Sequence, residues 1–273
     1  MKTKQDSVNN QYRQWLWLLS LLLFFGVLLS LSLGRYSNDP SKVLNVLFSR
    51  LGANVNVDPA MESIIFNVRL PRILASVMIG AMLSLSGAVY QSVFRNPLVS
   101  PDLLGVSSGA AVGAAGAILL GAGLITRQLF AFIGGMTAVL ITSLVPRILR
   151  NRSNMMLVLS GIIVGGFLSS VLAIMKFVAE EQTELSSIVF WQMGSLSSIL
   201  GRELLAILPI FLICSSLLLL LSWRINILAF GDLEARTLGV NVRQVRSIVI
   251  ICASLLTASA VSISGTIGWI GLV

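Results

Sequence analysis

Seven uncharged apolar stretches constrain this chain of 273 residues more than any other feature of its sequence. Each stretch is 18 to 23 residues long and contains no Asp, Glu, Lys or Arg. A helix needs about 20 such residues to cross the hydrocarbon of a bilayer, because its backbone polar groups must be satisfied within the segment. The sequence therefore predicts an all-α bundle with seven membrane-spanning helices, at residues 15–33, 73–94, 103–125, 128–145, 155–175, 204–223 and 247–264.

The distribution of charge predicts an orientation for these helices. Only 11% of the residues are charged, whereas a soluble domain carries roughly a quarter. With a cytoplasmic amino terminus, the inner segments hold eleven cations and four acids, and the outer segments hold eight cations and seven acids. Cytoplasmic loops of membrane proteins carry an excess of Lys and Arg. The bias therefore favours an amino terminus in the cytoplasm.

Three segments between the spans are long enough to hold structure of their own. In residues 34–72, a short amphipathic helix is expected to start at Pro40, with Val43, Leu44 and Phe48 on one face. Residues 186–201 are expected to form a short helix that dips partway into the membrane, and a complete crossing is the alternative. Residues 224–246 are expected to hold a short structure at the inner membrane surface.

Within the spans, small and polar residues favour close helix packing. Gly109 and Gly113, and likewise Gly161 and Gly165, have the spacing that lets helices approach closely. A hinge or a pathway wall is the alternative interpretation. Ser84, Ser86, Tyr90, Gln91 and Ser92 give the second span a polar side, which interhelical hydrogen bonds or a substrate pathway would explain.

Several residue types that other functions require are missing from the sequence. The chain has no His, and its predicted spans hold no acid that could relay protons. It also lacks the glycine-rich phosphate loop that ends in Gly-Lys-Ser/Thr, so ATP hydrolysis is expected in a partner. Cys214 and Cys252 fall inside spans as small apolar side chains, and no catalytic, cofactor or metal site is predicted. An ion-coupled secondary transporter remains as an alternative, because backbone carbonyls can bind sodium without carboxylates. A membrane scaffold without transport is a further alternative.

Several longer motifs resemble the signature of FecCD-type permeases, the membrane subunits of binding-protein-dependent ABC importers for iron(III) siderophores, haem and cobalamin. The resemblance rests on residues 69–72, Gly80, and residues 86–91, 95–98, 101–110, 231–240 and 264–273. It implies a single permease domain over residues 1–273, with a cytoplasmic ATPase-coupling loop at residues 223–246. Family members have ten helices, so seven and the start of an eighth are expected here, in a chain that is incomplete at its carboxyl terminus.

The resemblance also implies roles for particular residues. Arg69 and Arg72 would dock a solute-binding protein at the outer mouth, whereas the residues alone favour a membrane anchor beside a span. Ser153, Asn154 and Met155 would form the cytoplasmic gate, or otherwise an ordinary turn. The residues implied in ATPase coupling, or otherwise in a solvated loop, are Gly231, Asp232, Glu234, Ala235, Arg236, Leu238 and Gly239.

The expected protein is therefore a permease subunit in a bacterial or archaeal plasma (inner) membrane, not itself an enzyme. The resemblance implies a homodimer with cytoplasmic ATP-binding subunits and an extracytoplasmic solute-binding protein as partners, and no cofactor. An iron(III) siderophore is the expected cargo, with haem, cobalamin and molybdate as alternatives.

Overall fold

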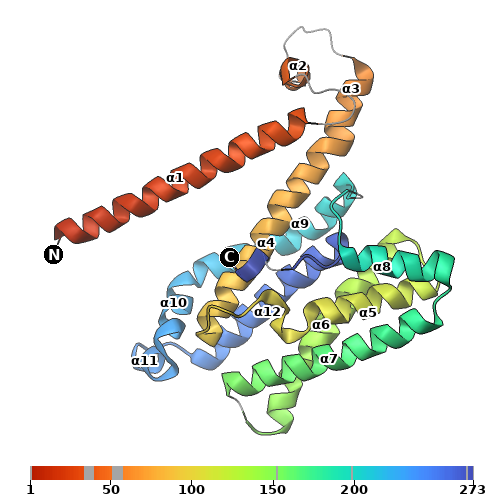
Figure 1. Ribbon diagram of the computed structural model, residues 1–273. Helices are drawn as coiled ribbons and strands as arrows, with labels where there is room; N and C mark the ends of the chain where they lie inside the picture. The colour runs from red at the N-terminus through yellow and green to blue at the C-terminus, as the bar shows by residue number, and fades with distance from the viewer. Residues whose placement is uncertain are drawn as a thin grey trace. The chain divides into compact units, whose positions relative to one another are not determined.

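The computed structural model describes residues 2–33, 40–50, 58–151, 153–197, 199–268 and 270–272, and every regular element in these ranges is helical. The chain divides into two compact units, Met1–Ala75 and Ser76–Val273. Figure 1 shows the helices in chain order. An all-helical architecture confirms the fold class expected from the apolar stretches.

The first unit contains α1 (Lys2–Ser32), α2 (Pro40–Arg50) and α3 (Pro59–Ile64). Its core includes Leu31, Val43, Val46, Met61 and Ile65, so the three helices pack against one another. The helix expected from Pro40 is confirmed, but its expected apolar face is wrong. Val43 and Val46 are buried, whereas Leu44 and Phe48 are exposed.

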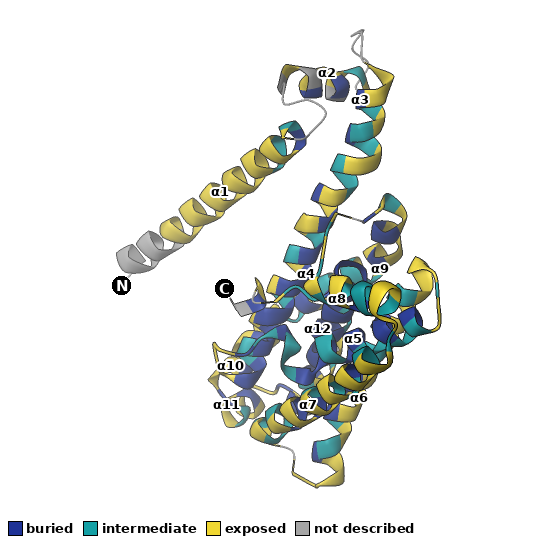
Figure 2. Ribbon diagram, turned by 45° about the vertical axis from the view of Figure 1, so that its right-hand side comes forward, coloured by how far each residue is buried: buried dark blue, intermediate teal, exposed yellow. Residues whose placement is uncertain are grey.

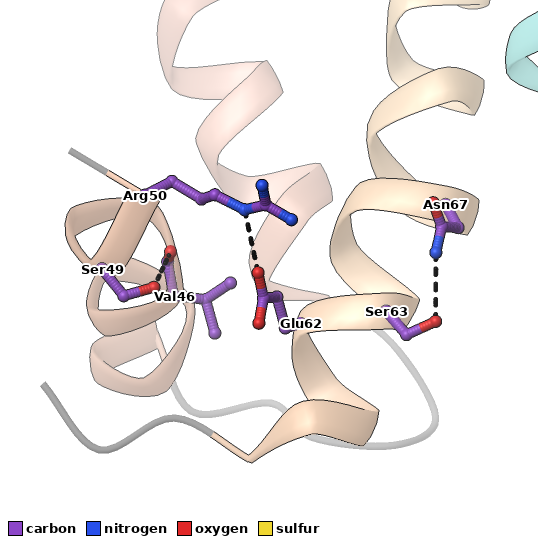
Figure 3. A network of polar contacts seen from close by, with 6 residues as sticks. All are labelled: Val46, Ser49, Arg50, Glu62, Ser63 and Asn67. Carbon is purple, nitrogen blue, oxygen red and sulfur yellow. Dashed lines mark hydrogen bonds and ion pairs between the residues drawn. The ribbon is translucent and has the colours of Figure 1, made fainter. Parts of the chain in front are cut away.

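A polar network joins α2 to α3 in this unit (Figure 3). Arg50 Nε donates to Glu62 Oε1 at 2.8 Å, and the guanidinium lies 5.1 Å from the centre of the Phe66 ring. Because the Arg50 side chain is 65% exposed and that of Glu62 35%, solvent screens the pair, which contributes at most about 1 kcal/mol. The apolar core therefore stabilises this unit more than the ion pair does.

The second predicted span begins well before its apolar stretch. Asp58 caps the helix by accepting a hydrogen bond from Ala60 N at 3.0 Å. The helix then continues through η1 (Ile65–Arg69), which is a π-helical turn, into α4 (Leu70–Phe94). Residues 59–72, expected to lie in an outer segment, are thus helical, because capping and continuous backbone hydrogen bonds extend the helix past the charged Glu62, Arg69 and Arg72.

Six of the seven predicted spans correspond to helices long and apolar enough to cross a membrane. These are α1, the helix through α4, α6 (Leu124–Ile148), α7 (Asn154–Val178), α9 (Gly201–Leu220) and α12 (Val242–Ser264).

The helix predicted over residues 103–125 is shorter in the structure. Residues Pro101–Leu104 form a 3₁₀ turn, η2, and Gly105 adopts a left-handed φ of +79°. Helix α5 (Val106–Leu119) has only 14 residues, about 21 Å against the roughly 30 Å of a bilayer core. Most of its Ala and Gly residues are buried in protein, so their apolar character reflects packing and not contact with lipid.

Helix α12 forms the centre of the second unit. It is buried along most of its length, as Figure 2 shows in dark blue, and it packs against α5, α6 and α9. Helices α5 and α6 pack most closely, because a Cβ on Gly109 would overlap Gly134 O and one on Gly113 would overlap Phe130 O. A Cβ on Gly161 would likewise overlap Leu103 O, whereas a Cβ on Gly165 would overlap no neighbouring atom. Close packing is confirmed at three of the four glycines.

We name the two ends of the second unit after the short helices that lie there. The α11 end comprises residues 95–105, 149–151, 153 and 221–241, with α10 (Ser222–Phe230) and α11 (Asp232–Thr237). The α8 end comprises residues 120–123, 179–197 and 199–200, the start of α9 and the end of α12. Its helix α8 (Ser186–Met193) has eight residues and follows the π-helical turn η3 (Glu181–Leu185). A complete crossing by residues 186–201 is therefore excluded.

Backbone contacts between two glycines fasten α8 to α12 at the α8 end. Gly194 and Gly265 have φ of +67° and +72°, and a Cβ on Gly265 would overlap the Trp191 carbonyl oxygen. Ser195 N donates to Ser264 O at 2.7 Å beside them. We call this contact the glycine clasp. It requires glycine both for the left-handed backbone and for the close approach.

The polar side of α4 is used for interhelical bonding. Ser86 Oγ donates to Ala253 O at 3.0 Å, and Tyr90 OH lies 2.6 Å from Ser254 Oγ on α12. Gln91 Nε2 donates to Gly271 O at 3.2 Å, so the irregular segment after α12 runs beside α4. Interhelical hydrogen bonds therefore explain Ser86, Tyr90 and Gln91 among the polar residues of this span.

Candidate functional site

The segment implied in ATPase coupling forms two short helices at the α11 end (Figure 1). Helix α10 ends at Gly231, whose φ is +142°, and α11 ends before Gly239, whose φ is +76°. Asn241 then caps α12 by accepting a hydrogen bond from Gln244 N at 3.2 Å. The two glycines allow the chain to turn sharply on each side of α11, as their positions in the sequence predict.

Charged side chains fix α11 against the start of α12. Arg246 Nη2 donates to Asp232 Oδ1 at 2.6 Å, and this bond lowers the pKa of the Asp232 carboxyl below its usual range. Arg95, from the turn after α4, adds to that lowering, and a Cβ on Gly231 would lie 3.6 Å from its Nη1. The Glu234 side chain folds back over Gly231 and would collide with the same Cβ. Three segments distant in sequence therefore meet at Asp232.

Helix α11 has a buried side and an exposed side. Ala235 is fully buried and packs the helix against the unit. Glu234, Arg236, Leu238 and Gly239 are exposed, as is Leu233 at 76%. Phe230, just before the turn, is 78% exposed. Apolar side chains exposed beside charges are typical of a surface that contacts another protein.

The three residues implied in the gate take different positions at the start of α7. Ser153 caps the helix, its Oγ accepting from Met156 N at 3.1 Å. Asn154 Nδ2 donates to the Val93 carbonyl at the end of α4, at 3.0 Å, whereas Met155 is 82% exposed. The structure thus brings Asn154 to α4 and leaves Met155 facing outward.

The last turn of α4 contacts both the segment implied in the gate and the segment implied in ATPase coupling. Val93 accepts the hydrogen bond from Asn154, and Arg95, two residues later, reaches the turn at Gly231. Arg95 has a left-handed φ of +54°, which ends α4 and redirects the chain there. The segment implied in the gate and the segment implied in coupling therefore share one support.

Arg69 and Arg72 lie in the first unit. Arg69 Nη1 donates to Leu31 O at 2.6 Å, so its guanidinium caps the carboxyl end of α1. Arg72 is exposed and also takes part in an interaction. Arg69 thus has a structural role that its place in the sequence did not indicate.

Sequence reasoning placed Leu233 and Arg246 in the expected coupling loop at residues 223–246, but it did not connect Arg246 or Arg95 with Asp232. Arg95 stands in the motif at residues 95–98, far from residues 231–240 in sequence, and Arg246 is the last residue of the inner segment expected at residues 224–246, with no partner assigned to it there. The sequence indicated only that these Arg residues, like Asp232, fall in segments expected on the inner side of the membrane.

Comparisons with known proteins agree along almost the whole chain. The model of the FecCD transport family matches residues 22–273. The molybdate import system permease protein MolB of Haemophilus influenzae is 40% identical over 267 residues, which is 97% of this chain and 78% of that protein. A probable iron chelatin transport system permease protein of Helicobacter pylori is 42% identical over 223 residues, 78% of this chain and 64% of its own length.

Two further proteins extend the comparison. The vitamin B12 import system permease protein BtuC of Escherichia coli is 32% identical over 278 residues, all of this chain and 79% of that protein. A solved structure of a metal-chelate type ABC transporter in an inward-facing conformation superposes with a TM-score of 0.83 at 39% identity, covering 96% of this chain and 79% of that one.

Proposed function

Because the chain belongs to the FecCD transport family and is a multi-pass permease subunit of an ABC importer, we propose that it imports an iron(III) chelate. Support for this cargo comes from the 42% identity with an iron chelatin permease and from the structural likeness to a metal-chelate transporter. Molybdate is the second candidate, because MolB is 40% identical over 97% of this chain. Cobalamin follows, from the 32% identity with BtuC.

Permeases of this family work with ATPase and binding-protein partners. We propose that two copies of this chain form a homodimer with its amino termini in the cytoplasm, so that the α11 end faces the ATPase. The excess of cations in the inner segments supports that orientation.

The single observation that supports the coupling role is the way α11 is fixed to the second unit while part of its surface stays exposed. Two glycines with left-handed backbones, one buried alanine and the Asp232–Arg246 pair hold the helix rigidly while Leu233 and Leu238 remain exposed. A rigid helix with exposed apolar side chains can dock into a cleft of another subunit and transmit its movement. The shared support at the end of α4 offers a route from α11 to Asn154, which we assign with Ser153 and Met155 to the cytoplasmic gate.

We assign Arg69 and Arg72 to contact with the binding protein. Charge-assisted hydrogen bonds from two neighbouring guanidinium groups suit carboxylates on a partner.

Transport assays test the function and the cargo. We expect uptake of an ⁵⁵Fe-labelled siderophore into vesicles that contain the permease, its ATPase and its binding protein, only when ATP is supplied. ⁹⁹Mo-molybdate and labelled cobalamin serve as parallel substrates. Uptake of molybdate alone would replace the iron assignment, and uptake driven by an ion gradient without ATP would contradict the importer.

Cysteine crosslinking tests the coupling surface. We expect Leu233→Cys and Leu238→Cys to crosslink to the ATPase subunit, because both side chains are exposed on α11. Ala235→Cys is the matched control on the same helix, and its buried position should prevent the crosslink. No crosslink from Leu233→Cys or Leu238→Cys under any nucleotide condition would show that α11 does not contact the ATPase.

A further inference from the structure

A cavity of about 380 Å³ lies at the α8 end of the second unit. Its walls come from α6, α8, α9 and α12, and they include Arg127, Trp191, Glu203 and Ser264. The glycine clasp forms part of the wall, because Gly265 and Ser195 also line the cavity. The cavity lies at the opposite end from α11 and involves none of the residues assigned above to the gate or to coupling.

Glu203 is the most informative residue in this cavity. The residue is only 4% exposed, and its Oε2 accepts from Leu200 N at 3.2 Å, which closes the first turn of α9. Its Oε1 is buried and has no hydrogen-bond partner in the described part of the chain. Leaving a buried carboxylate oxygen unpaired is costly. The arrangement therefore suits a ligand that brings a hydrogen-bond donor.

Arg127 supplies the opposite charge. Its Nε donates to Ala122 O at 2.8 Å, which holds the half-buried guanidinium at the wall. No bond from its terminal nitrogens to the described residues is found, and Arg127 and Glu203 form no ion pair with each other there. Opposite charges that line one cavity without pairing are complementary to a ligand that carries both a cation and an anion.

The cavity also opens onto an apolar surface. Phe190 and Leu124 line it and are 72% and 43% exposed. It lies where α6 and α9 begin and α12 ends, which is the depth of lipid head groups when these helices span a bilayer. A lipid could therefore place its head group inside while its acyl chains contact the exposed apolar side chains.

We propose that this cavity binds a zwitterion with a primary ammonium and a phosphate, as in a phosphoethanolamine head group. The ammonium would donate to Glu203, and the phosphate would accept from Arg127. The same chemistry occurs in free phosphoethanolamine, so a lipid and a soluble zwitterion are separate arms of the test. The inference rests on the cavity alone and does not depend on the cargo or on the ATPase.

Binding to the purified full chain in detergent tests the proposal. Native mass spectrometry would compare phosphatidylethanolamine with phosphatidylcholine of the same acyl chains, because a choline group has no N–H to donate. We expect phosphatidylethanolamine to bind with about tenfold higher affinity, because a hydrogen bond to a charged group contributes about that factor to binding. Glu203→Gln should reduce this preference to within about twofold while retaining an acceptor for Leu200 N. Arg127→Gln should weaken both lipids alike, because both carry a phosphate.

Matched variants at the same end keep the result specific. Glu181→Gln and Arg202→Gln remove exposed charges that do not line the cavity, and they should leave the tenfold preference unchanged. Helix content by circular dichroism checks that each variant is folded. Competition by free phosphoethanolamine at the affinity of the lipid would support the zwitterion site and identify a soluble ligand. Equal binding of the two lipids to the wild-type chain, or a preference that survives Glu203→Gln, would overturn the proposal.

Discussion

The two ends of the second unit hold their charged groups in contrasting ways. At the α11 end, Asp232 is paired with Arg246 and has Arg95 nearby, so its charge is already satisfied within the protein. At the α8 end, the glycine clasp joins backbone to backbone, while Glu203 and Arg127 remain apart in a cavity. Where backbone contacts provide the structure, the charged side chains remain available to a ligand.

The largest expected effect is at the glycine clasp. In Gly265→Ala the new Cβ would overlap the Trp191 carbonyl oxygen on a backbone with φ of +72°. Overpacking and left-handed strain together predict a loss of about 3 to 5 kcal/mol in the free energy of unfolding. Unfolding in detergent with a denaturant, followed by tryptophan fluorescence, measures the change. Gly268→Ala, where the Cβ meets open space, is the control, and equal stability of both variants would contradict the clasp.

A smaller loss is expected at the α11 end. Gly239 has φ of +76°, but nothing lies within 4 Å of an added Cβ. Gly239→Ala should therefore cost only the left-handed strain, about 1 to 2 kcal/mol, in the same unfolding measurement. Gly239→Asn should recover most of this loss, because Asn tolerates that backbone conformation. A cost as large as that of Gly265→Ala would remove the contrast between the ends.

The smallest effect is a dependence on pH at Asp232. Since Arg246 and its neighbours lower the pKa of this carboxyl in the folded state, its ionised form stabilises the fold above the unfolded pKa of about 3.9. This stabilisation is lost as the pH falls through the folded pKa. Because Asp232 is 37% exposed, the advantage of the wild type over Asp232→Asn at pH 7 should stay below about 1 kcal/mol.

Stability curves of both proteins between pH 7 and pH 3 measure this difference. The gap should persist to about pH 5 and close below about pH 4. A gap that widens as the pH falls would mean that Asp232 is destabilised in its ionised form.

The sequence predicted long helices better than their interruptions. Apolar length identified six of the helices that can span a membrane, because lipid exposure and helix length follow directly from composition. The same rule overestimated the length of the helix at residues 103–125, where α5 begins only after Gly105 and burial in protein accounts for the apolar residues. Local spacing cannot distinguish an apolar side chain facing lipid from one facing another helix.

Site residues were predictable only where they lie close together in sequence. Gly231 and Gly239 were identified from their spacing, and both have the left-handed backbone expected of them. The contact of Arg95 with that turn, the bond of Arg69 to Leu31 and the unpaired oxygen of Glu203 depend on segments brought together by folding. No pattern in one sequence specifies such pairs.

The hydrogen bond between Gln91 and Gly271 has a consequence for synthesis in the membrane. The two residues are 180 positions apart, so α4 is inserted long before its partner segment exists. At about 5 to 20 residues per second, the ribosome needs about 10 to 40 s to make the intervening chain. During that interval Gln91 must be covered by lipid, water or the insertion machinery. The packing of residues near Gly271 against α4 is thus a late step that follows insertion of α4. A chain in which this step fails would leave Gln91 without its partner, and membrane quality control could recognise it before transport begins.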